Sequence, residues 1–151
     1  LSILGITDFT VFNFPNKNIP YDESTVEAID SVLTEFKPDL IMTHWSFDTH
    51  QDHHNVSLAS ISAARWFNCI LMYEPFPPSG RSYHPYRPQM YIDITHDIET
   101  KKKAMAAHES QFKKYGPDWI ESIEGRARMR GNESGTKFAE SFEIVRYSLN
   151  I

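Results

Sequence analysis

Cysteine is almost absent from the sequence, and long apolar runs are absent altogether. Cys69 is the only cysteine among 151 residues, so the chain cannot form an internal disulfide, and nothing indicates a disulfide-stabilised secreted scaffold. No apolar stretch approaches the ~20 residues that a membrane-spanning helix needs. We therefore expect no membrane span, and a soluble domain in the cytoplasm.

Positive charge is also in deficit. Fifteen Lys and Arg stand against twenty Asp and Glu, which gives a formal net charge of −5. This balance argues against a nucleic acid or an anionic membrane surface as the main partner. Apolar residues make up 40% and charged residues 23% of the chain. That composition excludes a disordered or fibrous protein and, at this length, predicts one domain over residues 1–151.

The first residues do not have the features of a protein start. There is no initiator methionine, and LSILG at residues 1–5 is typical of a helix end with Gly5 as the C-cap. A signal peptide would need a basic start and a longer apolar stretch. We expect the sequence to be the later part of a longer chain; a short protein with a trimmed terminus is the alternative.

The order of apolar runs and helical repeats predicts an α/β fold with a mostly parallel sheet. Strands are expected at residues 8–12, 39–43, 68–73 and 90–95, and helices at 22–37, 52–66, 97–115 and 117–130. The stretch 74–88 is rich in proline and aromatic residues and is expected to form a long loop. Residues 131–135 are expected to form a turn, and residues 138–149 mix strand and helix signals.

The most informative segment is PDLIMTHWSFDTHQDHH at residues 38–54, which leaves a strand and enters a helix. Ligands bind at this edge in open α/β sheets. Four of the seven histidines lie between residues 44 and 54, and imidazole is the commonest metal ligand in proteins. His50 and His53 share a face of the helical turn, and Asp52 between them can orient one imidazole. A polar loop with incidental histidines is the alternative, and the placement after a buried strand disfavours it.

The ligand count of this segment is low for a catalytic zinc, which takes about three protein ligands and an open position. The segment supplies one or two ligands, and His84, His96 and His108 each stand alone in the sequence. The cluster therefore predicts a metal-dependent hydrolase with an incomplete ligand set. A metal phosphodiesterase and a catalytically inactive carbohydrate-binding or assembly subunit are the alternatives. If further ligands exist, His84, His96 and Glu74 are the first candidates.

The pattern Pro-Asp-x-x-x-Thr-His-x-x-x-Asp-x-His-x-Asp-His from Pro38 to His53 resembles the second motif of the LmbE-like, or PIG-L, N-acetylglucosaminyl deacetylases. The resemblance extends over about residues 5–142 in the family's order. Its further parts are Tyr73-Glu74, Tyr91–Ile94 leading to Lys103–Gln111, Arg130-Gly131 and Phe138–Phe142.

The resemblance implies a Rossmann-like three-layer sandwich, zinc or another divalent metal, and removal of an N-acetyl group from an amino sugar in a glycoconjugate or nucleotide-sugar. His53 matches the metal ligand, His50 the oxyanion-stabilising histidine, and Asp52 the carboxylate that tunes it. His44 and Asp48 match positions that support the ligands or contact the substrate.

One part of the family's pattern has no counterpart. The first motif, Ala-His-Pro-Asp-Asp-Glu, supplies a His and an Asp to the metal and an Asp as general base, and no segment of the 151 residues matches it. We therefore expect the chain to be about the C-terminal two-thirds of one deacetylase domain, without the N-terminal strand–helix unit. Alone, it should be inactive and bind zinc weakly. A homo-oligomer, or another chain that carries the missing segment, is the expected partner.

Substrate contacts are expected from the loop after the third strand. Its aromatic part, residues 76–86, suits a sugar ring, because the C–H faces of sugars pack on aromatic rings. Arg81 or Arg87 can bind a phosphate, as in a nucleotide-sugar, and Glu74 lies next to the predicted strand end. A packed loop with structural aromatics is the alternative.

Overall fold

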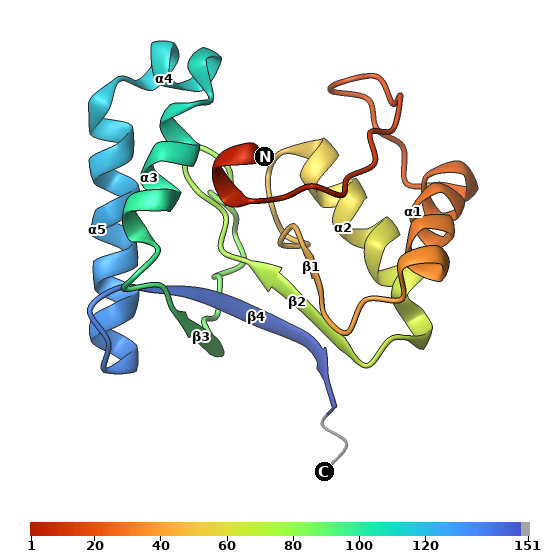
Figure 1. Cartoon of the computed structure of the whole chain (residues 1–151). Helices are drawn as coiled ribbons and strands as arrows, with labels where there is room; N and C mark the ends of the chain where they lie inside the picture. The colour runs from red at the N-terminus through yellow and green to blue at the C-terminus, as the bar shows by residue number, and fades with distance from the viewer. Residues whose placement is uncertain (149–151) are drawn as a thin grey trace. The chain divides into compact units, whose positions relative to one another are not determined.

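The computed structural model describes residues 1–148, in which there are five α-helices, two short 3-10 segments and four strands (Figure 1). The chain forms two compact units. Residues 1–9 and 91–141 make up unit 1, and unit 2 contains residues 10–90 and the chain from residue 142 onward. The single-domain assignment therefore stays a prediction, and each unit is described by itself.

The helices of unit 2 form where the sequence predicts them. Helix α1 (Glu23–Phe36) begins at Asp22, whose side chain accepts a hydrogen bond from the Thr25 amide, and ends at Lys37 in a left-handed conformation, just before Pro38. Helix α2 (Gln51–Ala63) continues into the 3-10 segment η2 (Ala64–Trp66). The core contains apolar residues from both helices and two strands: Leu33, Ile41, Ala63, Ala64 and Ile70.

The sheet is mixed. Strand β1 (Ile41–Thr43) pairs in parallel with β2 (Cys69–Tyr73), and β2 pairs antiparallel with β4 (Ala139–Tyr147). The strand order is β1-β2-β4-β3, with β3 at Met90–Asp93. The prediction of a mostly parallel sheet is therefore not confirmed, because the unassigned C-terminal segment runs beside β2 in the opposite direction. Leu149, the end of that segment, lies outside the described residues.

The strand expected at residues 8–12 is not formed. All five residues are exposed and lie outside the strands, because an apolar pattern makes a strand only where another strand supplies hydrogen bonds. The four-stranded mixed α/β architecture stands, whereas the three-layer sandwich and the missing N-terminal strand–helix unit stay predictions.

Unit 1 contains the remaining helices, packed around a small core of Ile94, Ile98, Ala127 and Phe138. The helix expected at 97–115 is divided into α3 (Ile98–Ala106) and α4 (Glu109–Tyr115). Helix α5 runs from Pro117 to Ser134, past the turn predicted at residue 131, and ends at Gly135. None of the helices in residues 1–148 combines the length and apolarity that crossing a membrane requires.

Candidate metal centre

The polar segment predicted to form a site lies within unit 2, between β1 and α2. His44 directly follows β1, and His53 lies in the first turn of α2. Since β1 and β2 are parallel, Tyr73 at the end of β2 lies at the same edge of the sheet. The site is therefore at the carboxyl ends of two parallel strands and at a helix N-terminus, as the strand–motif–helix order predicts.

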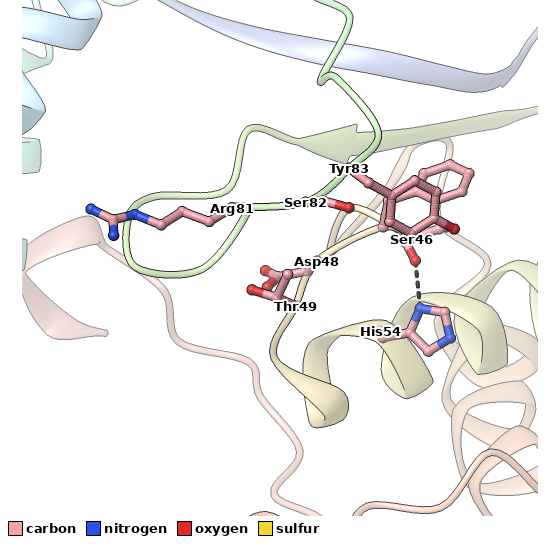
Figure 2. Close-up of a pocket in the computed structure, with 8 residues that line it drawn as sticks. Ser46, Asp48, Thr49, His54, Arg81, Ser82 and Tyr83 are labelled. Carbon is pink, nitrogen blue, oxygen red and sulfur yellow. Dashed lines mark hydrogen bonds between the residues drawn. The ribbon is translucent and has the colours of Figure 1, made fainter.

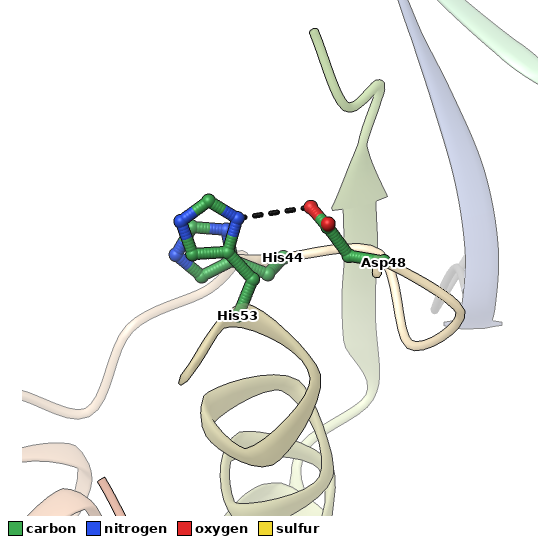
Figure 3. A group of neighbouring side chains, drawn as sticks. All are labelled: His44, Asp48 and His53. Carbon is green, nitrogen blue, oxygen red and sulfur yellow. Dashed lines mark hydrogen bonds and ion pairs between the residues drawn. The ribbon is translucent and has the colours of Figure 1, made fainter. Parts of the chain in front are cut away.

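Three side chains converge at this edge. The possible ligand atoms of His44, Asp48 and His53 all lie within 4.8 Å of one another (Figure 3). The His44 and His53 rings are stacked with centroids 4.1 Å apart, and the His50 ring stacks on the His53 ring at 4.4 Å. The structure thus brings together the expected ligand His53, the motif residues His44 and Asp48, and the ring of His50.

Asp48 holds the centre together. One carboxylate oxygen accepts hydrogen bonds from the backbone amides of His50 (2.8 Å) and Gly80 (3.2 Å), and the other lies 2.9 Å from Nδ1 of His53. Burial alone would raise the pKa of Asp48, but these hydrogen bonds outweigh it and hold the pKa below its usual value. An ionised carboxylate only accepts, so Nδ1 of His53 donates to it; in the neutral imidazole this leaves the lone pair on Nε2.

The neighbouring His44 is uncharged at neutral pH. Burial, together with the nearby His53, lowers the pKa of His44 to about 4. The Tyr73 ring lies edge-on to His44, with centroids 5.0 Å apart, and burial raises the pKa of this phenol. Both groups are therefore neutral at pH 7, and the imidazole of His44 retains a lone pair for a ligand.

The expected contact between Asp52 and His50 is not present. The buried Asp52 carboxylate accepts hydrogen bonds from the amides of Lys17 (2.6 Å) and Ile19 (3.1 Å). Nδ1 of His50 is buried without a hydrogen-bond partner among residues 1–148. Neighbouring side chains on a helix point about 100° apart, so Asp52 on α2 faces the loop before α1 and not the adjacent His53. The carboxylate that does meet His53 is that of Asp48, which lies outside the helix. Asp52 therefore anchors a loop to α2.

None of the other candidates belongs to the group of three converging side chains among the described residues. Glu74 directly follows β2 and is half-buried, and the guanidinium of Arg87 is paired with Glu143 at 2.8 Å. Arg81 is exposed. His84 is stacked on Phe47 with centroids 4.0 Å apart, and His96 is exposed in unit 1.

Sequence analysis did not identify Glu143. Its side chain is buried, with the residue 2% exposed, and its Oε2 accepts from Nε1 of Trp45 (3.1 Å) and from the Arg87 amide (3.1 Å). It therefore ties β4 both to the residue after His44 and to the end of the 74–88 loop. The sequence did contain a signal for it, because Glu143 is a charged residue directly between two apolar residues of β4.

The converging residues fit a divalent metal. Two imidazoles, one of them held neutral, and an ionised carboxylate are the donor types that zinc takes. The unpartnered, buried Nδ1 of His50 adds a polar atom beside them that no group in residues 1–148 satisfies. The fold and the site together define a class: α/β proteins with a candidate metal centre at the carboxyl edge of the sheet.

Comparison with known proteins points to one family. The family described as PIG-L: GlcNAc-PI de-N-acetylase matches residues 1–64, a range that contains the whole Pro38–His53 pattern. The resemblance to the PIG-L, or LmbE-like, family is thereby confirmed.

One curated relative is similar to this chain over more of its length. Diacetylchitobiose deacetylase of Thermococcus kodakarensis is 24% identical over 156 residues, which cover 95% of this chain and 58% of that protein. The chain thus spans less than two-thirds of the length of this curated relative.

Two solved structures share the fold. The conserved protein TT1542 from Thermus thermophilus has a TM-score of 0.83 at 22% identity, covering 99% of this chain and 71% of that one. The N,N'-diacetylchitobiose deacetylase from Pyrococcus horikoshii, in complex with its inhibitor MPG, has a TM-score of 0.73 at 20% identity, covering 95% of this chain and 59% of that one.

Proposed function

We propose that the chain is part of a metal-dependent amide hydrolase that removes the N-acetyl group from an N-acetylglucosamine-type amino sugar. The observation that carries the proposal is the convergence of His44, Asp48 and His53 at the strand ends. The similarity to a diacetylchitobiose deacetylase over 95% of the chain supports the choice of reaction.

Zinc is the proposed metal, and His53 and His44 would hold it. His53 offers Nε2, since Nδ1 faces Asp48, and His44 offers a neutral imidazole. Asp48 orients His53, as carboxylates commonly do for metal-binding histidines. A bound zinc supplies an activated water and polarises the amide carbonyl.

His50 is the proposed stabiliser of the oxyanion. It stacks on His53, and its Nδ1 has no hydrogen-bond partner among the described residues. A positioned donor of this kind is typically worth ~3 kcal/mol in the transition state. Asp52 contributes indirectly, because it fixes the loop at Lys17 and Ile19 against the helix that carries His53.

The general base is not assigned to a residue of this chain. The family resemblance implies that the general base is an Asp of the Ala-His-Pro-Asp-Asp-Glu motif, which the 151 residues do not contain. The activity therefore requires a segment that supplies the motif, from the same polypeptide or from a partner chain. We place the enzyme in the cytoplasm, acting on a small amino-sugar substrate.

Restoring the missing motif tests the proposal. Zinc content and deacetylation of N,N'-diacetylchitobiose are measured for the chain alone and for a version extended by an upstream Ala-His-Pro-Asp-Asp-Glu segment. We expect weak zinc binding and no turnover from the chain alone, and zinc-dependent deacetylation from the extended version. A folded, extended protein that binds zinc and releases no acetate would contradict the proposal and favour an inactive subunit.

A further inference from the structure

His54 is the one histidine among residues 44–54 that has no part in the proposed reaction. It lies in the first turn of α2, directly after His53, and is half-buried. Figure 2 shows its ring turned to Ser46, with Nδ1 2.5 Å from the backbone carbonyl oxygen of that residue. A carbonyl oxygen only accepts, so Nδ1–H of His54 is the donor.

Ser46 is held by side-chain contacts as well. It lies midway between two of the three converging residues, in the loop between β1 and α2. Its hydroxyl is 2.8 Å from the hydroxyl of Ser57, which is fully buried, and 3.2 Å from Sδ of Met72 on β2. Ser57 follows His54 by three positions, so both side chains lie on one face of α2. This face of the helix therefore fixes both the backbone and the side chain of Ser46.

The contacts of α2 are divided among different faces of the helix. Asp52 and Asn55 bind the loop before α1, since Asp52 accepts from two of its amides and Asn55 donates to the Ile19 carbonyl at 2.8 Å. His53 faces the metal centre, and the next side chain, His54, points about 100° away from it. The hydrogen bond to Ser46 thus fixes α2 to the β1–α2 loop independently of the loop before α1.

The geometry of the metal centre depends on how α2 sits against the β1–α2 loop. The loop contributes His44 and Asp48, and the helix contributes His53. A zinc ion takes its ligands at about 2.0–2.2 Å, so a shift of one piece against the other weakens binding. Ser46 lies inside the turn that the Asp48 amide closes on the Trp45 carbonyl at 3.1 Å. Displacement of Ser46 would therefore displace Asp48.

We infer that His54 is a positioning residue of the metal centre. By donating to the Ser46 carbonyl, it holds the loop that carries two of the converging residues against the helix that carries the third, before any metal binds. The inference rests on the proposed function for the identity of the ion. His54 itself contacts neither the ion nor the substrate and acts through Ser46.

The tautomer of His53 in the metal-free 151-residue chain tests the inference, because the contact with Asp48 keeps a proton on Nδ1. Long-range ¹H–¹⁵N NMR spectra identify the protonated nitrogen at about pH 8, where an ordinary imidazole is neutral. We expect Nδ1–H in the parent and a clear shift toward Nε2–H in His54→Leu, which keeps an apolar side chain and removes the donor. In His54→Asn, the amide nitrogen is as many bonds from the backbone as Nδ1 of histidine, so the parent tautomer should be restored.

Ser62→Ala is the matched control. It removes a hydrogen bond of 2.9 Å between the same helix and Tyr21, outside the metal centre, and should leave the His53 tautomer unchanged. Circular dichroism verifies that each variant is folded. The parent tautomer in a folded His54→Leu would overturn the inference, and so would an equal shift in Ser62→Ala or a failure of His54→Asn to restore the tautomer.

Zinc affinity of the extended protein, measured by competition with a chelator, is the second readout. We expect His54→Leu to weaken zinc binding by about 10–100-fold, as replacement of groups that orient metal ligands commonly does. His54→Asn and Ser62→Ala should stay close to the parent, and unchanged affinity in His54→Leu would overturn the inference. An extended protein that binds no zinc in any form would contradict the proposed metal-dependent reaction, while the His53 tautomer would still decide the role of His54.

Discussion

Asp48 is the residue on which the geometry of the centre depends. It accepts hydrogen bonds from two backbone amides and faces the His53 imidazole, so it connects the loop at Gly80 to the first turn of α2. Its charge is stabilised by these donors. A single buried carboxylate therefore both orients the His53 imidazole and ties it to the loop at Gly80.

His50, just before α2, and His53, in its first turn, are expected to differ in their effects when replaced. In the extended protein, His53→Ala should abolish zinc binding, because it removes the ligand that Asp48 orients. His50→Ala should keep zinc and lower kcat by roughly 10²–10³. Metal content and steady-state kinetics measure both effects, with His96→Ala as the control. Equal loss of zinc from both variants would show that the two roles are wrongly divided.

Glu143 is expected to matter for stability rather than for chemistry. Glu143→Ala leaves the buried Trp45 indole N–H without its acceptor and the Arg87 guanidinium without its ion-pair partner. We expect a loss of about 2–3 kcal/mol in the free energy of unfolding, measured by urea denaturation. Glu143→Gln keeps an acceptor for Trp45 and should cost clearly less. Similar losses from both variants would mean that the charge, and not the hydrogen bond to Trp45, carries the effect.

At the scale of elements, two glycines near the end of α5 have different roles. Helix α5 continues through Gly131, where an added Cβ would lie 2.7 Å from the Lys137 carbonyl group, so the segment before β4 can approach the helix only because this residue is glycine. The true end is at Gly135, which has a φ of 78°. A sequence pattern alone does not distinguish these two glycines, since the first is required by packing and the second by the backbone.

Two glycines of α5 should respond oppositely to replacement by alanine. Gly131→Ala forces the Lys137 backbone to move and should lower the free energy of unfolding by about 1–3 kcal/mol. A Cβ added at Gly125 would meet no atom within 4 Å, so Gly125→Ala should raise stability by about 0.5–1 kcal/mol through helix propensity. Urea denaturation of the two variants checks this, and a stabilising Gly131→Ala would contradict the packing argument.

The start of α1 should be sensitive to acid. The Ser24 hydroxyl and the Thr25 amide hold the pKa of Asp22 below its ordinary value of 3.8. Since the folded-state pKa is the lower one, the stabilisation is full above the unfolded value and is lost as the pH falls through the folded value. Asp22→Ala should therefore lower the urea midpoint at pH 7, and the difference from the parent should shrink below about pH 4. Asp22→Asn keeps a neutral cap and should remove this pH dependence; a gap between Asp22→Ala and the parent that does not narrow as the pH falls below about 4 would contradict the assignment.

At the scale of the whole molecule, the candidate metal centre lies within unit 2. Its three converging residues all lie between positions 44 and 53. Zinc binding should therefore slow amide hydrogen exchange in residues 44–54 and leave helices α3 and α5 unchanged. Equal protection of α5 would show that the metal acts on more than its own unit.

The sequence predicted most elements because their signals are local. Asp22 caps α1, Pro117 opens α5, and the apolar runs at β1, β2 and β3 are short and bounded by breakers. Residues 8–12 have a similar strand-like pattern, but they are exposed and do not belong to any strand. Strand formation and direction are non-local, so β4 and its antiparallel pairing with β2 could not be predicted from local pattern.

The candidate site divides in the same way. The sequence by itself determined the residue types, their place after a strand, and the histidine spacing that puts His50 and His53 on one face. Only the tertiary structure decided which carboxylate meets an imidazole: Asp48 faces His53, and Asp52 binds a loop more than thirty positions earlier in the chain. The physical reason is that spacing sets directions along one helix, whereas a carboxylate's partner depends on segments that only folding brings near it.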